Sequence, residues 1–324
     1  MAQVIRLTAA GGPECMQMQQ LELAAPGPGE VLLAQEAVGV NPLDVLQRKG
    51  IAPISLPSGL GLEGAGKVLA LGAGVDQFAV GDRVAYATGP LGAYASERLY
   101  PAERLVKLPD SISAEQAAAV LFKGITAQYL LTSTYAVGPG TTVLLYGASG
   151  GVGQLMASWA KHLGATVIGV VSKPQSQARA LAAGCAHALV FDPQTLAADV
   201  RAITGGRMAD VVCDGLGKLS FAASLDCLRP RGLMVSFGAT TGAPPAVEMA
   251  TLNAKGSLYI TRPSLAAHTA TAAEYQQRAT AVLQAVEQGV IQPVIGRRYA
   301  LADVAAAHAD LEAGLTQGAV VLLP

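Results

Sequence analysis

The residues most suggestive of chemistry lie in one short stretch, YGASGGVGQ, at 146–154. Three glycines stand within four positions there, although glycine loses more conformational freedom on folding than any other residue. Such a segment is expected where the backbone turns sharply, packs closely against another backbone, or approaches a ligand.

The sequence on either side of the glycines identifies the kind of turn. The apolar run TVLLYG (142–147) precedes them, and VGQLMASWAKHLG (152–164) follows with apolar residues at helical spacing. A strand, a glycine-rich turn and a helix form the context that a dinucleotide-binding fingerprint requires.

The fingerprint A-x-G-x-x-G assigns a role to each small residue. Ala148 is expected to permit the tight turn, Gly150 to let a pyrophosphate approach the backbone, and Gly153 to let the helix pack on the strand. The amides of Gly151 and Val152, at the start of the helix, would then face the phosphates. The alternative is a turn kept only for packing.

The end of the second strand indicates which nucleotide is bound. NAD sites usually place a carboxylate there, whereas this chain has Ser172 and Lys173, followed by Arg179. A lysine and a hydroxyl can bind a 2′-phosphate that a carboxylate would repel. The sequence therefore favours NADPH, the alternative being that Lys173 and Arg179 belong to a solvated helix start.

Strand-like and helix-like segments alternate around these residues, which indicates an α/β fold with a parallel, doubly wound sheet. We expect strands at 142–147, 166–172, 187–191, 209–215, 232–238 and 256–263, and helices at 152–164, 176–184, 193–206 and about 218–228.

The remainder of the chain has a different texture. Residues 1 to about 120 carry short apolar runs separated by Gly and Pro, which is typical of a β-rich, barrel-like unit. We expect strands there at 31–40, 65–72 and 82–87, and, in the tail, helices near 271–289 and 302–314 and a closing strand at 319–324.

The composition excludes several classes of protein. The 324 residues are 51% hydrophobic and 14% charged, and 22 basic residues balance 23 acidic ones, so nothing favours nucleic acid or a charged membrane surface. No secretory signal or membrane-spanning run is evident. The four cysteines lack C-x-x-C spacing and are typical of reduced thiols in a cytoplasmic protein: Cys15, Cys185, Cys213 and Cys227.

Over its whole length the chain resembles the zinc-independent (zeta-crystallin-like) quinone oxidoreductases of the medium-chain dehydrogenase/reductase superfamily. The segments that carry the resemblance are GVNPLD (39–44), LPSGLGLEGAG (56–66), KGITAQYLL (123–131), GASGGVG (147–153), SLDCLRPRGLMVSFG (224–238) and SLYITRPSL (257–265). The resemblance implies a GroES-like catalytic domain, residues 1–122 and 266–324, and an inserted Rossmann NADP-binding domain, residues 123–265.

Many relatives in that superfamily hold a catalytic zinc, and this chain lacks the expected ligands. Asn41 stands where those relatives have the first cysteine, and Leu62 stands where they have a histidine. An amide oxygen and an alkyl group cannot replace thiolate and imidazole. We therefore expect no metal, and a structural role for the neighbouring Glu63.

The resemblance also implies site residues. Asn41 and Thr126 are expected beside the nicotinamide ribose and ring, while Leu216, Phe237 and Gly238 border the cofactor. Asn41 has an alternative, which is that it is only a turn residue before Pro42. Arg262 is expected to face the interdomain cleft, where its guanidinium could steady a quinone oxygen. The alternative for Arg262 is an ion pair across the domain hinge.

Three departures from the family pattern bear on specificity. Leu46 replaces a tyrosine that lines the substrate cleft, Phe191 replaces a cofactor-contacting tyrosine, and Ser176 replaces a phosphate-binding lysine. These changes leave the substrate preference and the strictness of NADPH selection open.

The expected function is NADPH-dependent transfer of a hydride to a quinone or a similar conjugated carbonyl, without zinc. Asn41 and Arg262 are the candidate catalytic residues. The alternatives are a zinc-free reductase of 2-enoyl thioesters or enones, and an NADPH-binding structural or RNA-binding protein. The family usually forms homodimers, with the sheet edge near 256–261 as the expected contact.

Overall fold

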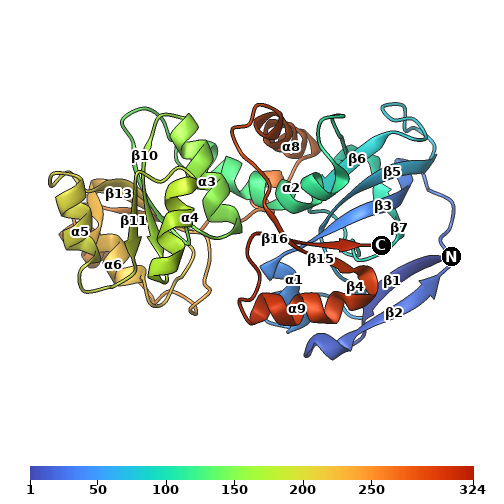
Figure 1. Ribbon diagram of the computed structural model, residues 1–324, viewed down its shortest axis with the longest axis horizontal. Helices are drawn as coiled ribbons and strands as arrows, with labels where there is room; N and C mark the ends of the chain where they lie inside the picture. The colour runs from blue at the N-terminus through green and yellow to red at the C-terminus, as the bar shows by residue number, and fades with distance from the viewer. The chain divides into compact units, whose positions relative to one another are not determined.

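The computed structural model describes residues 1–324 and divides them into two compact units (Figure 1). Unit 1 consists of Met1–Ile125 and Thr269–Pro324, and unit 2 consists of Thr126–His268. The first boundary falls inside one helix, α2 (Ala114–Tyr129).

Unit 2 is built on a parallel sheet of six strands in the order β11-β10-β9-β12-β13-β14, which is the Rossmann order 3-2-1-4-5-6. The expected number of strands is confirmed. The edge strands β11 and β14 are shorter and more exposed than the buried strands expected there. The strands are β9 (Thr142–Tyr146), β10 (Thr166–Val171), β11 (His187–Val190), β12 (Ala209–Asp214), β13 (Leu228–Ser236) and β14 (Tyr259–Thr261).

Helices cover both faces of this sheet, with α3 and α4 on one face and α5 and α6 on the other (Figure 1). They are α3 (Gly151–His162), α4 (Gln177–Ala182), α5 (Leu196–Ile203), α6 (Phe221–Asp226) and α7 (Met249–Ala254).

Three of these helices are shorter than the sequence predicts, and local backbone explains why. A 3₁₀ turn, η4 (Pro174–Ser176), precedes α4. Gly205 and Gly206 follow α5, and their positive φ angles prevent the helix from continuing. Gly217 also has a positive φ, so α6 begins only after it. Helix α7 was not expected from the sequence.

Unit 1 contains two sheets. The larger has the order β15-β16-β3-β5-β6-β8, with β7 also paired to β3, and the smaller has the order β2-β1-β4. The strands are β1 (Ala2–Leu7), β2 (Met16–Leu21), β3 (Glu30–Val40), β4 (Ser58–Gly59), β5 (Glu63–Leu71), β6 (Arg83–Ala87), β7 (Glu97–Pro101), β8 (Val106–Lys107), β15 (Ile295–Ala300) and β16 (Ala319–Leu323).

The strands expected at 31–40, 65–72, 82–87 and 319–324 are present as β3, β5, β6 and β16. The helices of unit 1 are α1 (Pro42–Arg48), α2, α8 (Ala272–Glu287) and α9 (Val304–Glu312). Helices α8 and α9 were expected, whereas α1 and α2 were not. The remaining helical turns are η1 (Pro13–Cys15), η2 (Ala102–Arg104), η3 (Leu130–Thr134), η5 (Ala267–Thr269) and η6 (Leu301–Asp303).

Each unit has its own apolar core, formed in unit 2 around the central strands and in unit 1 between the larger sheet and the N-terminal strands. All four cysteines are unpaired, and three of them are buried. None of the helices is both long enough and apolar enough to cross a membrane.

Candidate functional site

The glycine turn lies at the carboxyl end of β9. Gly147 has φ +63°, so Gly147 makes the tight turn that the sequence assigned to Ala148. Ala148 is instead fully buried and faces β10, where a Cβ on Gly169 would lie 2.8 Å from the Ala148 Cβ. The turn is where it was expected, but the role of Ala148 is packing.

The start of α3 follows this turn directly. Gly150 is the N-cap and has no side chain with which to cap the helix. The amides of Gly151 and Val152 therefore belong to the first turn of a 12-residue helix without a side-chain acceptor. Gln154 braces the loop, because its Nε2 donates to the carbonyl oxygen of Ser149 at 3.0 Å. Free amides and the helix dipole together suit a phosphate group.

The turn also lies at the point where the strand order of the sheet reverses. Strands β9 and β12 are neighbours, and the chain continues from β9 toward β11 on one side and from β12 toward β14 on the other. In open α/β sheets ligands bind at this switch point, outside the carboxyl ends of the strands. Seven of the expected residues of unit 2 follow the carboxyl ends of its strands: Ser172, Lys173, Phe191, Leu216, Phe237, Gly238 and Arg262.

The side chains after β10 fit the phosphate that was expected there. Ser172 and Lys173 are both exposed, so each can meet a ligand. Phe191, after β11, is half-buried, and it packs edge-on against Tyr146 with the two ring centroids 5.7 Å apart. Arg262, after β14, is exposed and donates from Nη1 to Ser236 Oγ at 3.2 Å.

Asp214, at the end of β12, is a functional candidate that the sequence reading missed. Its carboxylate accepts the amides of Leu216 at 2.7 Å and Gly217 at 3.1 Å, and two serine hydroxyls. Its carbonyl oxygen accepts the Phe237 amide at 2.9 Å. One buried aspartate thus fixes both loops that were expected to border the cofactor.

In unit 1 the expected residue Asn41 lies in a buried polar group. Asn41 is the N-cap of α1 and is 1% exposed. Its Oδ1 accepts from Lys123 Nζ at 2.7 Å, and its Nδ2 donates to Glu63 Oε2 at 2.9 Å. Glu63 also accepts the Phe122 amide at 2.6 Å. Both polar atoms of the Asn41 side chain are therefore held by hydrogen bonds. A residue that served only to form the turn before Pro42 would not need these two contacts.

Lys123 was not singled out from the sequence. It lies on α2, is 7% exposed, and places Nζ 3.7 Å from Glu63 Oε2. Burial raises the pKa of the Glu63 carboxyl, and the charge of Lys123 and the hydrogen bond from Asn41 act against that rise. Thr126, further along α2, is half-buried.

A second buried set continues from Asn41. Asp44 Oδ2 accepts the Asn41 amide and the Tyr94 hydroxyl, each at 2.8 Å, and that hydroxyl lies 3.0 Å from His308 Nε2. Burial raises the pKa of Asp44 to about 7, although its two hydrogen bonds favour the charged form. Burial, with the charge of Arg48, lowers the pKa of His308 to about 4.

The residues at the expected zinc position do not fit a zinc ion. Asn41 Oδ1 points at an amino group, which would repel a cation, and Leu62 is a buried alkyl side chain. No cluster of three or more His, Cys, Asp or Glu side chains suited to a metal ion is present in the chain.

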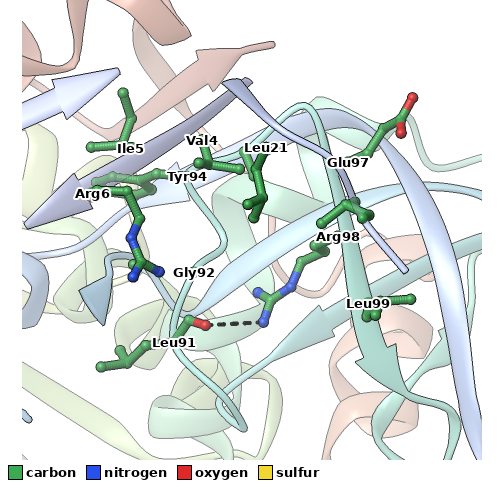
Figure 2. Close-up of a pocket in the computed structure, with 13 residues that line it drawn as sticks. Val4, Ile5, Arg6, Leu21, Leu91, Gly92, Tyr94, Glu97, Arg98 and Leu99 are labelled. Atoms are coloured by element: carbon green, nitrogen blue, oxygen red, sulfur yellow. Dashed lines mark hydrogen bonds between the residues drawn. The ribbon is translucent and has the colours of Figure 1, made fainter. Parts of the chain in front are cut away.

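Unit 1 also contains a cavity of about 170 Å³ beside β1 and β7 (Figure 2). Arg6 and Arg98 are its basic residues. The Arg98 guanidinium donates to the Tyr86 hydroxyl and to the carbonyls of Pro90 and Leu91, and it lies over two tyrosine rings. Arg98 is thus occupied by protein partners.

Two family models match the chain. The alcohol dehydrogenase GroES-like domain matches residues 27–110, and the zinc-binding dehydrogenase model matches residues 151–283. These matches confirm the expected GroES-like and Rossmann-type parts of the fold.

Relatives of known name resemble the whole chain. A quinone oxidoreductase of Pseudomonas aeruginosa is 46% identical over 100% of both chains, and a 2-haloacrylate reductase of Burkholderia sp is 42% identical over 97% of this chain and 96% of its own. The crystal structure of Escherichia coli quinone oxidoreductase complexed with NADPH is 41% identical, with a TM-score of 0.94 over 99% of this chain and 100% of that one.

Proposed function

The chain belongs to the quinone oxidoreductase family of the medium-chain dehydrogenase/reductase superfamily, and we propose that it reduces quinones with NADPH. The observation that carries the proposal is the combination of uncapped amides at the start of α3 with exposed Ser172 and Lys173 after the second strand. A relative 41% identical over 99% of this chain was crystallised with NADPH.

The residues of unit 2 bind and orient the cofactor in this proposal. The amides of Gly151 and Val152 hold the pyrophosphate, Gly150 leaves room for it, and Ser172 and Lys173 bind the 2′-phosphate. Leu216, Phe237 and Gly238 border the nicotinamide half, on loops that Asp214 fixes. NADPH, when bound, supplies the hydride.

The remaining residues position the nicotinamide and the acceptor. Asn41 and Thr126 position the nicotinamide ribose and ring, and Arg262 offers its guanidinium to an acceptor oxygen. A quinone is already electrophilic and becomes aromatic on reduction, so position and hydrogen bonds to the developing oxyanion suffice.

One comparison favours a second candidate acceptor, a conjugated C=C. The 2-haloacrylate reductase relative is 42% identical, and its name describes reduction of such a bond. Hydride addition to a conjugated C=C places charge on a carbonyl oxygen, as quinone reduction does, so the same residues could serve both substrate classes.

A panel of acceptors tests the proposal. Purified protein is mixed with NADPH or NADH and with quinones, enones, 2-haloacrylates or enoyl thioesters, with and without a chelator, while cofactor absorbance is followed. We expect NADPH oxidation that depends on a quinone, exceeds the rate with NADH, and is unchanged by the chelator. Binding of NADPH with no turnover of any acceptor would contradict the proposal and favour a structural or RNA-binding role.

We further propose a cytoplasmic homodimer. The unpaired cysteines support the compartment. The outer edge of β14 has no partner strand, and Tyr259 on it is 62% exposed, so this edge can pair with a second copy. Sedimentation of the wild type and of Ile260→Pro, which would break edge pairing, tests the dimer.

A further inference from the structure

Lys123 combines burial with unused hydrogen-bonding capacity. Lysine is almost never fully buried unless it is paired, yet Lys123 is 7% exposed and its Nζ has one hydrogen-bond acceptor, Asn41 Oδ1. The Glu63 oxygen lies 3.7 Å away, beyond hydrogen-bonding distance. An ammonium carries three N–H donors, so two of them meet no protein acceptor.

Glu63 does not account for this arrangement. Its carboxylate is satisfied by neutral donors, the Asn41 amide at 2.9 Å and the Phe122 backbone N–H at 2.6 Å. Glu63 therefore fixes Asn41 and offsets the charge of Lys123 from 3.7 Å, a longer separation than the 2.7 Å from Lys123 Nζ to Asn41 Oδ1. A buried donor that lacks an acceptor costs free energy. Such an unsatisfied group in a folded protein calls for an explanation, and a catalytic role is one.

Two side chains near Asn41 are poorly suited to give a proton. The hydroxyl of Tyr94 is engaged by Asp44 and His308, and Leu46, which stands in place of a family tyrosine, has an alkyl side chain. Lys123, by contrast, is an amino group in direct contact with the side chain of the candidate catalytic residue Asn41.

We propose that Lys123 is a catalytic residue that donates a proton to the acceptor oxygen, and that this matters most for conjugated carbonyls. This inference rests on the proposed function. The acceptor carbon gains the hydride, its oxygen takes the negative charge, an N–H bond of Lys123 breaks and an O–H bond forms. The neutral amine then regains a proton from water, beside the carboxylate of Glu63.

The substrate dependence follows from basicity. A phenol has a pKa of about 10, so the hydroquinone product holds its negative charge well without a proton donor. An enolate oxygen is a stronger base and depends more on the donor. Loss of Lys123 should therefore lower the reduction of an enone more than the reduction of a quinone.

The test compares Lys123→Met, Lys123→Gln and Lys123→Arg with Lys67→Met, an exposed lysine of the same unit. The Gln variant can still donate to Asn41, and the Arg variant keeps the charge but does not release its proton. For each variant we measure the melting temperature, the NADPH Kd, and kcat and KM for one quinone and one enone in H2O and D2O.

We expect Lys123→Met and Lys123→Gln to lower kcat for the enone by about a hundredfold or more, to lower quinone turnover less, and to change the NADPH Kd by less than about twofold. Lys123→Arg should not restore enone turnover, and Lys67→Met should match the wild type. The solvent isotope effect on enone reduction should differ between the wild type and Lys123→Gln.

Three outcomes would overturn the inference. They are folded Lys123 variants with wild-type enone turnover, variants that lose NADPH affinity and turnover in parallel, and equal losses with both acceptors. A wild-type protein that oxidises NADPH with no acceptor would refute the proposed function itself, and the assignment of Lys123 with it.

Discussion

Gly153 lies directly against Gly147, so that a Cβ on Gly153 would stand 2.8 Å from the Gly147 carbonyl carbon and 2.9 Å from the Ala148 Cα. The first turn of α3 and the end of β9 are thus in backbone-to-backbone contact. By contrast, a Cβ on Gly150 would meet only the Gly147 carbonyl oxygen, at 3.2 Å. The two glycines therefore serve different purposes, and substitutions can separate them.

Gly150→Val should abolish the binding of both NADPH and NADH while the protein still folds. The backbone of Gly150 has φ −85°, which a side chain can adopt, but the new methyl groups would stand where the pyrophosphate approaches. We expect an affinity loss of about a hundredfold or more, equivalent to about 2.8 kcal/mol, in a fluorescence titration. Gly153→Ala is the companion variant, and it should lower the melting temperature. Unchanged affinity in Gly150→Val would mean that this loop does not hold the pyrophosphate.

Lys173→Glu should weaken NADPH binding about tenfold or more and leave NADH binding nearly unchanged. The substitution replaces a cation that can bind the 2′-phosphate with an anion that repels it. Lys161→Glu, on the exposed end of α3, is the matched charge reversal. The two dissociation constants are measured for each variant, and equal losses for both nucleotides would contradict the assignment of Lys173.

Asp44→Asn should change how the free energy of unfolding depends on pH. The pKa of Asp44 is about 7 in the folded protein, above the ordinary value of 3.8. The folded state therefore binds more protons between these values, and the stability that Asp44 contributes is present below about pH 4 and lost as the pH rises to about 7. An asparagine at this position does not titrate, so the variant does not lose this stability as the pH rises.

The difference in stability between Asp44→Asn and the wild type should accordingly grow with pH over that window, by at most about 1.4 kcal/mol per pH unit. His308, which titrates nearby, is present in both proteins and cancels in the comparison. Denaturant unfolding at several pH values measures the difference, with the fully exposed Asp110→Asn as the control. Parallel curves for Asp44→Asn and the wild type would exclude a raised pKa for Asp44.

Gly39→Ala should destabilise unit 1. A Cβ on Gly39 would lie 2.9 Å from the Glu63 carboxyl carbon and would overlap the Ala118 carbonyl oxygen of α2. Overpacking of this kind typically costs about 1–3 kcal/mol. Thermal unfolding measures the effect, and Gly138→Ala, where a Cβ would meet nothing within 4 Å, should be neutral. Equal melting temperatures for the two variants would show that α2 can move away from β3 without cost.

The parts of the fold that the sequence predicted are those with a clear local pattern. Helix α3 has an apolar stripe and begins at the glycines, and the strands of unit 2 are compact apolar runs between turn residues. Helix α2 was missed because it is buried on nearly every side, which removes the amphipathic stripe that marks a helix.

The polar groups of unit 1 were missed for another reason. Lys123 meets Asn41 across 82 residues, and Tyr94 meets His308 across 214. A lysine after an apolar run resembles a solvated residue until the fold buries it, and no local spacing reveals such pairs. The fingerprint assigned the turn to Ala148 because it counts positions, whereas the positive φ belongs to Gly147.

Strand β16 lies between β15 and β3, so residues 319–323 join β15, which is made shortly before, to strands made before unit 2. During synthesis every residue of unit 2 leaves the ribosome before this strand does, and unit 2 needs no residue outside its own span to form its sheet. Unit 2 can therefore fold before β16 of unit 1 has been synthesised. Until then β3 lacks its partner at residues 38–40, and an open strand edge of this kind can pair with another chain.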